Sequence, residues 1–208
     1  MIVADNLSEL KELLEENLTN LPLVTKVTDI VHGEGDTRAE VMFIGEAPGY
    51  HEYVQRRPFV GRSGQLLRKT LTEVGLSPEQ VFISNIVKAR PPDNRDPLPE
   101  EIEAFRPFLN REIELIDPQL IVTLGRFSMA KFLPDARVSQ VHGRVHRAIW
   151  QEKPVYVLPM YHPAAALRST QLKTTFINDF KKIIPVLNWV KEEVTKQNQV
   201  EMVREALQ

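Results

Sequence analysis

The stretch Val41-Met42-Phe43-Ile44-Gly45-Glu46-Ala47-Pro48-Gly49 decides the fold, because four consecutive apolar residues run directly into a turn rich in glycine and proline. An unbroken apolar run is typical of a parallel strand that is buried on both faces of its sheet. Three further runs share this character: Val81–Val87, Leu120–Leu124 and Val155–Leu158. The sequence therefore predicts a buried parallel sheet.

Apolar residues recur at helical spacing between these runs. The predicted helices cover about Ser63–Val74, a segment from near Pro99, a short segment after Gly125, and a longer one from near Thr170 that is interrupted at Pro185. Alternating strands and helices predict an α/β protein, a three-layer α/β/α sandwich. The charged residues 190–208 predict a solvated helical tail behind a domain of residues 1–189.

The composition fits one soluble domain: 208 residues, 42% hydrophobic and 26% charged, with a net charge of −2. No apolar run approaches the roughly 18 residues that span a bilayer, and the N-terminus lacks the pattern of a signal peptide. We therefore expect a cytoplasmic protein without membrane contact. The absence of cysteine excludes disulfides, thiolate catalysis and cysteine-ligated metal clusters.

Polar residues gather where the predicted strands end. Gly45–Gly49 follows the first strand, Asn85 lies within the second, and Tyr161-His162-Pro163 follows the fourth. Ligand sites of open α/β sheets form at the carboxyl ends of strands, so these residues should converge on one rim. A buried amide needs hydrogen-bond partners, so Asn85 either braces the structure or reads a nucleobase. His162 alone is equally compatible with an ordinary loop residue.

The net charge gives no general attraction to nucleic acid, so any contact with DNA requires a local basic patch. Nine cations fall mostly in the loops of the predicted rim: Arg56, Arg57, Arg62, Lys88, Arg90, Arg95, Arg144, Arg147 and Arg168. Scattered arginines usually mean only a solvated surface. Their clustering near one rim of an otherwise acidic chain favours a patch that follows a phosphate backbone.

Four ordered motifs resemble the family 4 uracil-DNA glycosylases, and the likeness runs from about residue 18 to residue 184. The motifs are Gly45–Gly49, Arg57–Gly64, Asn85–Lys88 and Tyr161–Ala165. The resemblance implies a central four-stranded parallel sheet and hydrolysis of the N-glycosidic bond of deoxyuridine in DNA, in base excision repair. It also implies that the base is flipped out of the helix before cleavage.

The resemblance assigns roles to individual residues. Phe59 matches the residue that stacks on the flipped uracil, Asn85 the reader of N3 and O4, and His162 the donor to O2. Glu46 and Glu52 match acidic residues linked with the attacking water, and the choice between them stays open. The first loop, with Gly45 and Ala47, supplies backbone N–H groups to the base. The predicted DNA contacts are Arg62, Ser63, Lys88, Arg90, Arg144, Ala166, Leu167 and Arg168.

Two departures from the family pattern stand out. Four cysteines usually hold an iron–sulfur cluster, and their positions here are apolar: Leu18, Leu21, Ala89 and Phe105. We therefore expect no cluster, no metal and no other cofactor, and we expect these four side chains to pack together in its place. The family also usually has a leucine where Ala166 stands, so Ala166 would be a weaker wedge in duplex DNA.

Two alternatives remain at this stage. A broader glycosylase would also remove hypoxanthine or xanthine, and a non-catalytic DNA-binding module would keep the fold without the reaction. Asn85 and Glu46 favour the narrow uracil activity. The combination of Glu46, Phe59, Asn85 and His162 favours an enzyme. The expected partner is uracil-containing DNA, and the expected oligomeric state is a monomer.

Overall fold

A computed structural model describes residues 2–206; residues 1, 207 and 208 and the side chains of 201 and 203–206 lie outside this description. The elements are α1 (Leu7–Glu16), η1 (Leu18–Asn20), η2 (Val27–Asp29), β1 (Glu34–Gly35), β2 (Val41–Gly45), α2 (Tyr50–Gln55), α3 (Arg62–Glu73), β3 (Phe82–Asn85), η3 (Pro92–Asn94), α4 (Pro99–Ile116), β4 (Leu120–Leu124), α5 (Arg126–Ala130), α6 (Val138–Val141), β5 (His146–Trp150), β6 (Lys153–Met160), α7 (Pro163–Ala166), α8 (Thr170–Phe180) and α9 (Ile183–Ala206).

Within the described residues, six strands form one mixed sheet in the order β1-β3-β2-β4-β6-β5. The pairs β3–β2, β2–β4 and β4–β6 are parallel, whereas β1 and β5 pair antiparallel at the two edges. The predicted α/β class is confirmed, but the prediction of a four-stranded sheet missed both edge strands. β1 has only two residues, and β5 is partly exposed, so neither has the unbroken apolar run on which the prediction relied.

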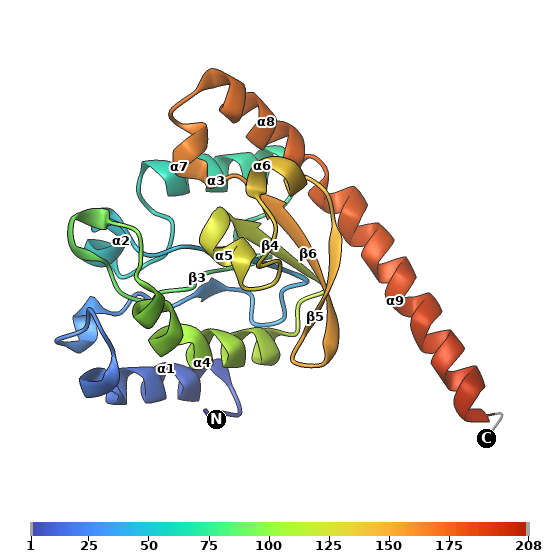
Figure 1. Cartoon of the computed structure of the whole chain (residues 1–208), viewed down its shortest axis with the longest axis horizontal. Helices are drawn as coiled ribbons and strands as arrows, with labels where there is room; N and C mark the ends of the chain where they lie inside the picture. Colours follow the sequence, from blue (N-terminus) through green and yellow to red (C-terminus); the bar gives the residue numbers. More distant parts are fainter. Residues whose placement is uncertain (1, 207–208) are drawn as a thin grey trace.

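Helices cover both faces of the sheet (Figure 1). Val41 and Phe43 of β2 share an apolar cluster with residues of α3 and α8. Met42 and Ile44 of the same strand pack in a second cluster with residues of α4. Two-residue periodicity therefore places a core on each face of the sheet, which gives three layers.

A third apolar cluster joins the N-terminal segment to the domain, and we call it the N-terminal cluster. Its buried members are Ala4, Leu10, Leu14, Leu21, Val24, Ile30, Val87, Ala89, Phe105 and Phe108. Helix α1 begins at a side-chain cap, because Asn6 accepts hydrogen bonds from the N–H groups of Ser8 and Glu9, both at 3.0 Å. The capped helix lies against α4 and buries Leu10 and Leu14 in this cluster.

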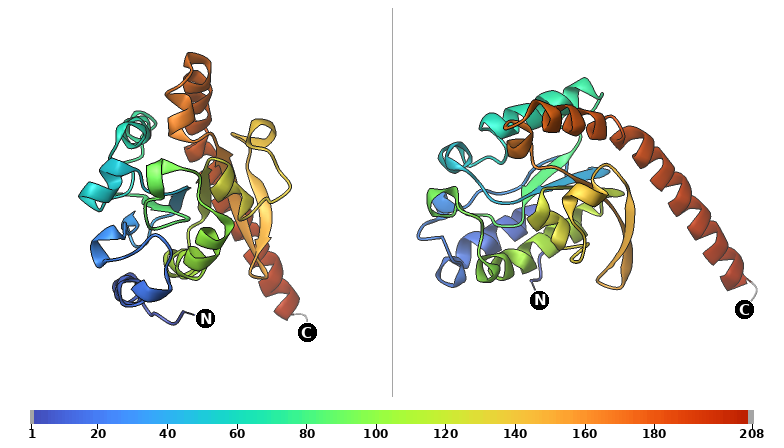
Figure 2. Two further views of the ribbon diagram at one scale, coloured as in Figure 1. Left: turned by 60° about the vertical axis from the view of Figure 1, so that its left-hand side comes forward. Right: turned by 45° about the horizontal axis from the view of Figure 1, so that its top comes forward.

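The last helix, α9, is continuous across the predicted boundary at residue 189 and then projects away from the domain (Figures 1 and 2). Val190 is fully buried in the core, so the anchored part of the helix extends beyond that boundary. The helical break expected at Pro185 lies earlier, between Phe180 and Ile183. Pro185 is instead in the first turn of α9, where its missing N–H is not needed. The separate tail of residues 190–208 stays a prediction. Residues 207–208 and the side chain of residue 203, which belong to that tail, lie outside the described residues.

No helix within residues 2–206 is long and apolar enough to cross a membrane.

Candidate active site

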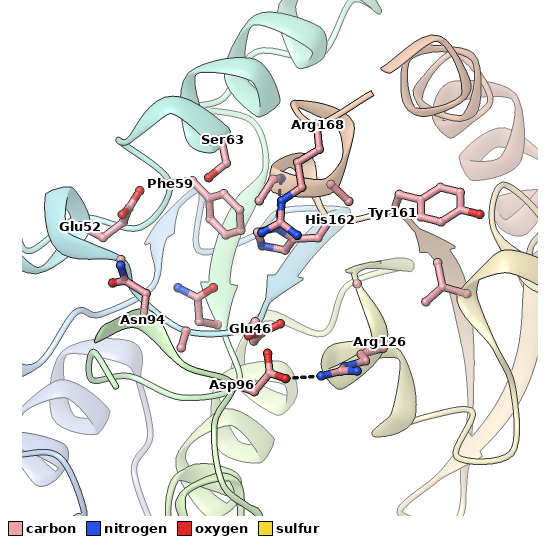
Figure 3. A pocket seen from close by; sticks show the side chains of 17 residues that line it. Glu46, Glu52, Phe59, Ser63, Asn94, Asp96, Arg126, Tyr161, His162 and Arg168 are labelled. Atoms are coloured by element: carbon pink, nitrogen blue, oxygen red, sulfur yellow. Dashed lines mark hydrogen bonds and ion pairs between the residues drawn. The ribbon is translucent and has the colours of Figure 1, made fainter. Parts of the chain in front are cut away.

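The carboxyl ends of the four inner strands open into a cleft of about 790 Å³ (Figure 3). Each strand end contributes to its lining: Glu46 follows β2, Asn85 ends β3, Arg126 follows β4, and His162 follows β6. Parallel strands necessarily bring their carboxyl ends to one edge of the sheet. The predicted convergence of Glu46, Asn85 and His162 on one rim is therefore seen in the structure.

The floor of the cleft depends on a glycine. A Cβ atom at Gly45 would lie 2.4 Å from both the Asn85 Oδ1 atom and the Phe59 ring, so only glycine allows these side chains to meet there. Asn85 is 3% exposed, and its Oδ1 atom has no hydrogen-bond partner among the described residues. Buried acceptors are nearly always paired, so this oxygen is available to a donor in the cleft.

His162 lies beside Phe59 with the ring centroids 5.9 Å apart, and Figure 3 shows both rings above Glu46. The backbone N–H of Ala164 donates to His162 Nδ1 at 3.2 Å, so Nδ1 carries no proton. Burial lowers the pKa of His162 to about 4. The negative charge of Glu52 opposes this shift, and the positive charge of Arg168 adds to it. The ring is therefore neutral at pH 7, with its proton on Nε2, and is a hydrogen-bond donor through that atom.

Burial favours the neutral form of Glu46 as well, which for a carboxyl group means a raised pKa. Burial raises the pKa of its carboxyl group to about 7, with a further increase from the negative charge of Asp96 and a decrease from Arg126. Asp96 and Arg126 form an ion pair at the rim, drawn in Figure 3. Close to half of the Glu46 side chains are thus ionised near neutral pH, which suits a group that accepts a proton from water.

Glu52, the second acidic candidate, already has partners. Its Oε1 atom accepts hydrogen bonds from the backbone N–H groups of Val60 and Gly61, at 2.9 and 2.7 Å. The carboxylate lines the cleft but also holds the turn that follows Phe59. This arrangement favours a positioning role for Glu52.

Two predicted DNA contacts are wrong. Lys88 is 2% exposed and donates to the Glu112 carboxylate at 2.6 Å, so its charge is neutralised inside the protein. Ala166, the last residue of α7, is 1% exposed and packs in the core, so it cannot enter DNA. Its neighbour Leu167 is 41% exposed and presents the apolar surface instead.

The other predicted DNA contacts lie at or near the rim. Ser63 and Arg168 line the cleft, and Arg62 is exposed at the start of α3 beside Ser63. Arg90 stacks on the Tyr50 ring, with its guanidinium carbon 5.4 Å from the ring centroid, and donates to the Asn94 side chain at 2.8 Å. Arg144 is exposed beyond α6, outside the residues that line the cleft.

Several lining residues were not predicted: Asn94, Asp96, Arg126 and Val138. Arg126 could have been found, because it follows Gly125 at the end of a predicted strand, where the strand-end rule already applied. Asp96 and Asn94 lie in a long loop whose path no local pattern specifies. Their place in the wall of the cleft depends on the tertiary structure.

The four predicted former cluster positions meet in the N-terminal cluster. Leu21, Ala89 and Phe105 are buried members, and Leu18 is partly buried against them. These side chains offer carbon where iron would need sulfur, so they do not fit an iron–sulfur cluster. Among the described residues, no group of three or more histidine, aspartate or glutamate side chains is placed to hold a metal ion.

Comparison with known proteins agrees with this fold and site. The Uracil DNA glycosylase superfamily matches residues 32–187. A type-4 uracil-DNA glycosylase of Sulfurisphaera tokodaii is 46% identical over 75% of this chain and 74% of its own length. Those of Archaeoglobus fulgidus and Thermotoga maritima are 45% and 40% identical, over 75% and 84% of this chain and 81% and 93% of theirs. The chain therefore belongs to the uracil DNA glycosylase superfamily and, within it, to the type-4 uracil-DNA glycosylases.

Proposed function

We propose that this protein is a uracil-DNA glycosylase that hydrolyses the N-glycosidic bond of deoxyuridine in DNA, as the names of its relatives suggest. One observation carries the proposal. The Phe59, Asn85 and His162 side chains line the same cleft, the Asn85 Oδ1 atom has no hydrogen-bond partner among the described residues, and the His162 ring is neutral. A flat base with a donor and an acceptor on adjacent atoms suits this set of groups.

Asn85 selects the base. Its Oδ1 accepts from N3–H of uracil, and its amide nitrogen donates to O4. Cytosine presents an acceptor and a donor at these two positions, so both hydrogen bonds would be lost. An unpaired or misdirected polar group in a buried site costs about 1–3 kcal/mol, which gives the discrimination its scale.

His162 stabilises the leaving group. When the bond between N1 and C1′ breaks, its electron pair passes to the uracil ring and charge develops on O2 and O4. A neutral His162 donates its Nε2–H to O2. Such preorganised donors are each worth about 3–4 kcal/mol in the transition state.

Glu46 supplies the base for the nucleophile. A water oxygen attacks C1′, and the proton that it loses passes to the Glu46 carboxylate. Its pKa of about 7 leaves a substantial ionised fraction at neutral pH. Glu52 keeps the turn after Phe59 in place through the two backbone N–H groups that it binds.

DNA lies across the rim in this proposal. Arg62, Arg90 and Arg168 contact phosphates, and Ser63 adds a neutral donor. The exposed Leu167 fills the space that the extruded base leaves, in place of the buried Ala166. Unstacking a base costs a few kcal/mol, and an apolar wedge offsets part of that cost.

We also propose that the enzyme works as a monomer without an iron–sulfur cluster. All of the groups assigned above come from one chain. The N-terminal cluster joins the segment of residues 18–31 to α4 by apolar contacts, where the family's cluster would do so by coordination.

The test is release of free uracil from a labelled oligonucleotide, as a single strand and in a duplex opposite guanine or adenine. Parallel strands with hypoxanthine or xanthine separate the narrow activity from the broader one, and iron is assayed in the same preparation. The proposal expects uracil release by iron-free protein and much less release of the other bases. Tight DNA binding without release of uracil would identify a non-catalytic binding module and overturn the proposal.

A further inference from the structure

The turn that carries Phe59 has an unusual backbone. Phe59 has a φ of 54°, in the left-handed region that residues other than glycine rarely adopt. Its side chain is 5% exposed and forms part of the wall of the cleft. A backbone in this region persists only where the surrounding groups hold it, so the contacts of this turn bear directly on where the ring lies.

Two charged side chains hold the turn from opposite ends. Glu52 binds the two N–H groups that follow Phe59, as described above. Arg68 binds the carbonyl groups: its Nε donates to the Phe59 oxygen and its Nη2 to the Pro58 oxygen, both at 2.9 Å. A guanidinium can bind both oxygens at once because its donors are fixed in a planar fork.

Arg68 is itself fixed by its place on α3. Gly64 lies one helical turn earlier on the same face, and a Cβ there would come within 2.1 Å of the Phe59 carbonyl, so the helix presses directly on the turn. On the other side, Arg68 pairs with the Glu34 carboxylate of β1, which Arg57 also binds, at 2.8 and 3.0 Å. The pKa of Glu34 lies below its usual value, because the hydrogen bonds and charges of the two arginines outweigh the effect of burial.

We propose that Arg68 is a positioning residue for uracil excision: it keeps the Phe59 turn in the left-handed conformation that presents the ring to the extruded base. The inference rests on the proposed function, because a flipped base must be there to stack on the ring. Arg68 does not line the cleft, so it acts through Phe59 and not through contact with the substrate.

The first experiment compares Arg68→Ala, Arg68→Lys and Arg57→Ala in single-turnover uracil release from duplex DNA. Small displacements of positioning groups cost on the order of 10- to 100-fold in rate, and we expect Arg68→Ala to fall in this range. Arg68→Lys should lie between Arg68→Ala and wild type, because an ammonium group lacks the planar fork. Arg57→Ala is the matched control: it removes an arginine from the same carboxylate, but the Arg57 side chain donates to neither carbonyl within the described residues.

The second experiment asks whether Arg68 acts through the ring. In a Phe59→Leu background, Arg68→Ala should reduce the rate by less than about threefold, because residues that act as a unit are not additive. Binding is then measured to DNA with an uncleavable 2′-fluoro-deoxyuridine and to DNA with a tetrahydrofuran site, which has no base. Arg68→Ala should weaken binding to the first more than to the second. A purely structural role would weaken both alike.

The outcomes separate the two proposals. Wild-type protein that releases no uracil contradicts the proposed function. If the wild type is active, any of three results would overturn the role of Arg68 and leave the proposed function standing. They are release of uracil by Arg68→Ala at the wild-type rate, a loss of rate that multiplies with that of Phe59→Leu, and equal weakening of binding to both DNA ligands. Should Arg68→Ala fail to fold, Arg68→Lys takes its place in both experiments, and the same three outcomes decide.

Discussion

The cleft and the N-terminal cluster treat polar atoms in opposite ways. In the cleft, Asn85 keeps an unpaired buried oxygen, Glu46 has a raised pKa, and His162 has a lowered one. The N-terminal cluster consists of apolar side chains that pack against one another. The cleft thus gives up stability to keep polar groups available for a ligand, whereas the cluster supplies stability and no chemistry. Substitutions in the two regions should separate stability from activity.

The largest effect is expected in the N-terminal cluster. Phe105 is fully buried there, and Phe105→Ala should lower the free energy of unfolding by about 3–5 kcal/mol. Denaturant unfolding measures this loss, and Leu18→Ala, at the partly buried edge of the same cluster, should cost less. Uracil release per folded molecule should stay close to wild type. A large loss of activity in folded Phe105→Ala protein would break the contrast between the two regions.

The matching change in the cleft is His162→Ala. Removing a donor to the developing charge should raise the activation free energy by about 3–4 kcal/mol, which lowers the single-turnover rate by about 10²- to 10³-fold. DNA affinity and unfolding free energy should change far less, because the phosphate contacts and the core remain. Rate and binding are measured on the same duplex. Equal losses in both would remove His162 from its assigned role.

Asn85→Ala sharpens the comparison at a single buried residue. The change removes the oxygen that has no partner in the described structure, so stability should move by less than about 1 kcal/mol. The activation free energy of uracil excision should rise by about 1–3 kcal/mol, because N3–H and O4 lose their partner. Thermal unfolding and single-turnover rates together test the pair of expectations. Stability that fell with activity would make Asn85 a structural brace.

The pH dependence of the reaction tests Glu46. The carboxyl group becomes ionised as the pH rises through its raised pKa of about 7, so the rate should rise with pH and level off above that value. The pKa of His162, about 4, lies too low to contribute near neutrality. Arg126→Gln removes a charge that lowers the pKa of Glu46, so the midpoint should move to higher pH. Single-turnover rates are measured between pH 5 and 9, and Glu46→Gln should abolish the rise of the rate with pH. A pH profile that is unchanged in both variants would exclude Glu46 as the base.

The smallest effect concerns the rim. Each phosphate contact on duplex DNA releases about 0.9 counterion, so Arg168→Ala should reduce the slope of log affinity against log salt by about one. Lys69→Ala is the control, because Lys69 lies exposed on α3 and pairs with Glu73. Affinity is measured across a series of salt concentrations. An unchanged slope for Arg168→Ala would place this arginine outside the DNA contact.

The sequence predicted correctly where a local pattern carries the physical cause. Unbroken apolar runs specify buried strands, and the geometry of a parallel sheet brings their carboxyl ends to one edge. Glu46, Asn85 and His162 could therefore be placed together before the structure was known. The edge strands β1 and β5 have no such pattern, since one is too short and the other too exposed.

The tertiary structure alone decided which side chains are free to act. Lys88 looked like a phosphate contact, but Glu112, 24 residues later on α4, neutralises it inside the protein. Ala166 and Leu167 are adjacent in the chain, yet one is in the core and the other at the surface. Arg68 reaches the Phe59 turn because α3 folds back over it. Charge pairing and burial depend on partners distant in sequence, so the sequence determined the fold class and the site, and only the packed chain determined the role of each charge.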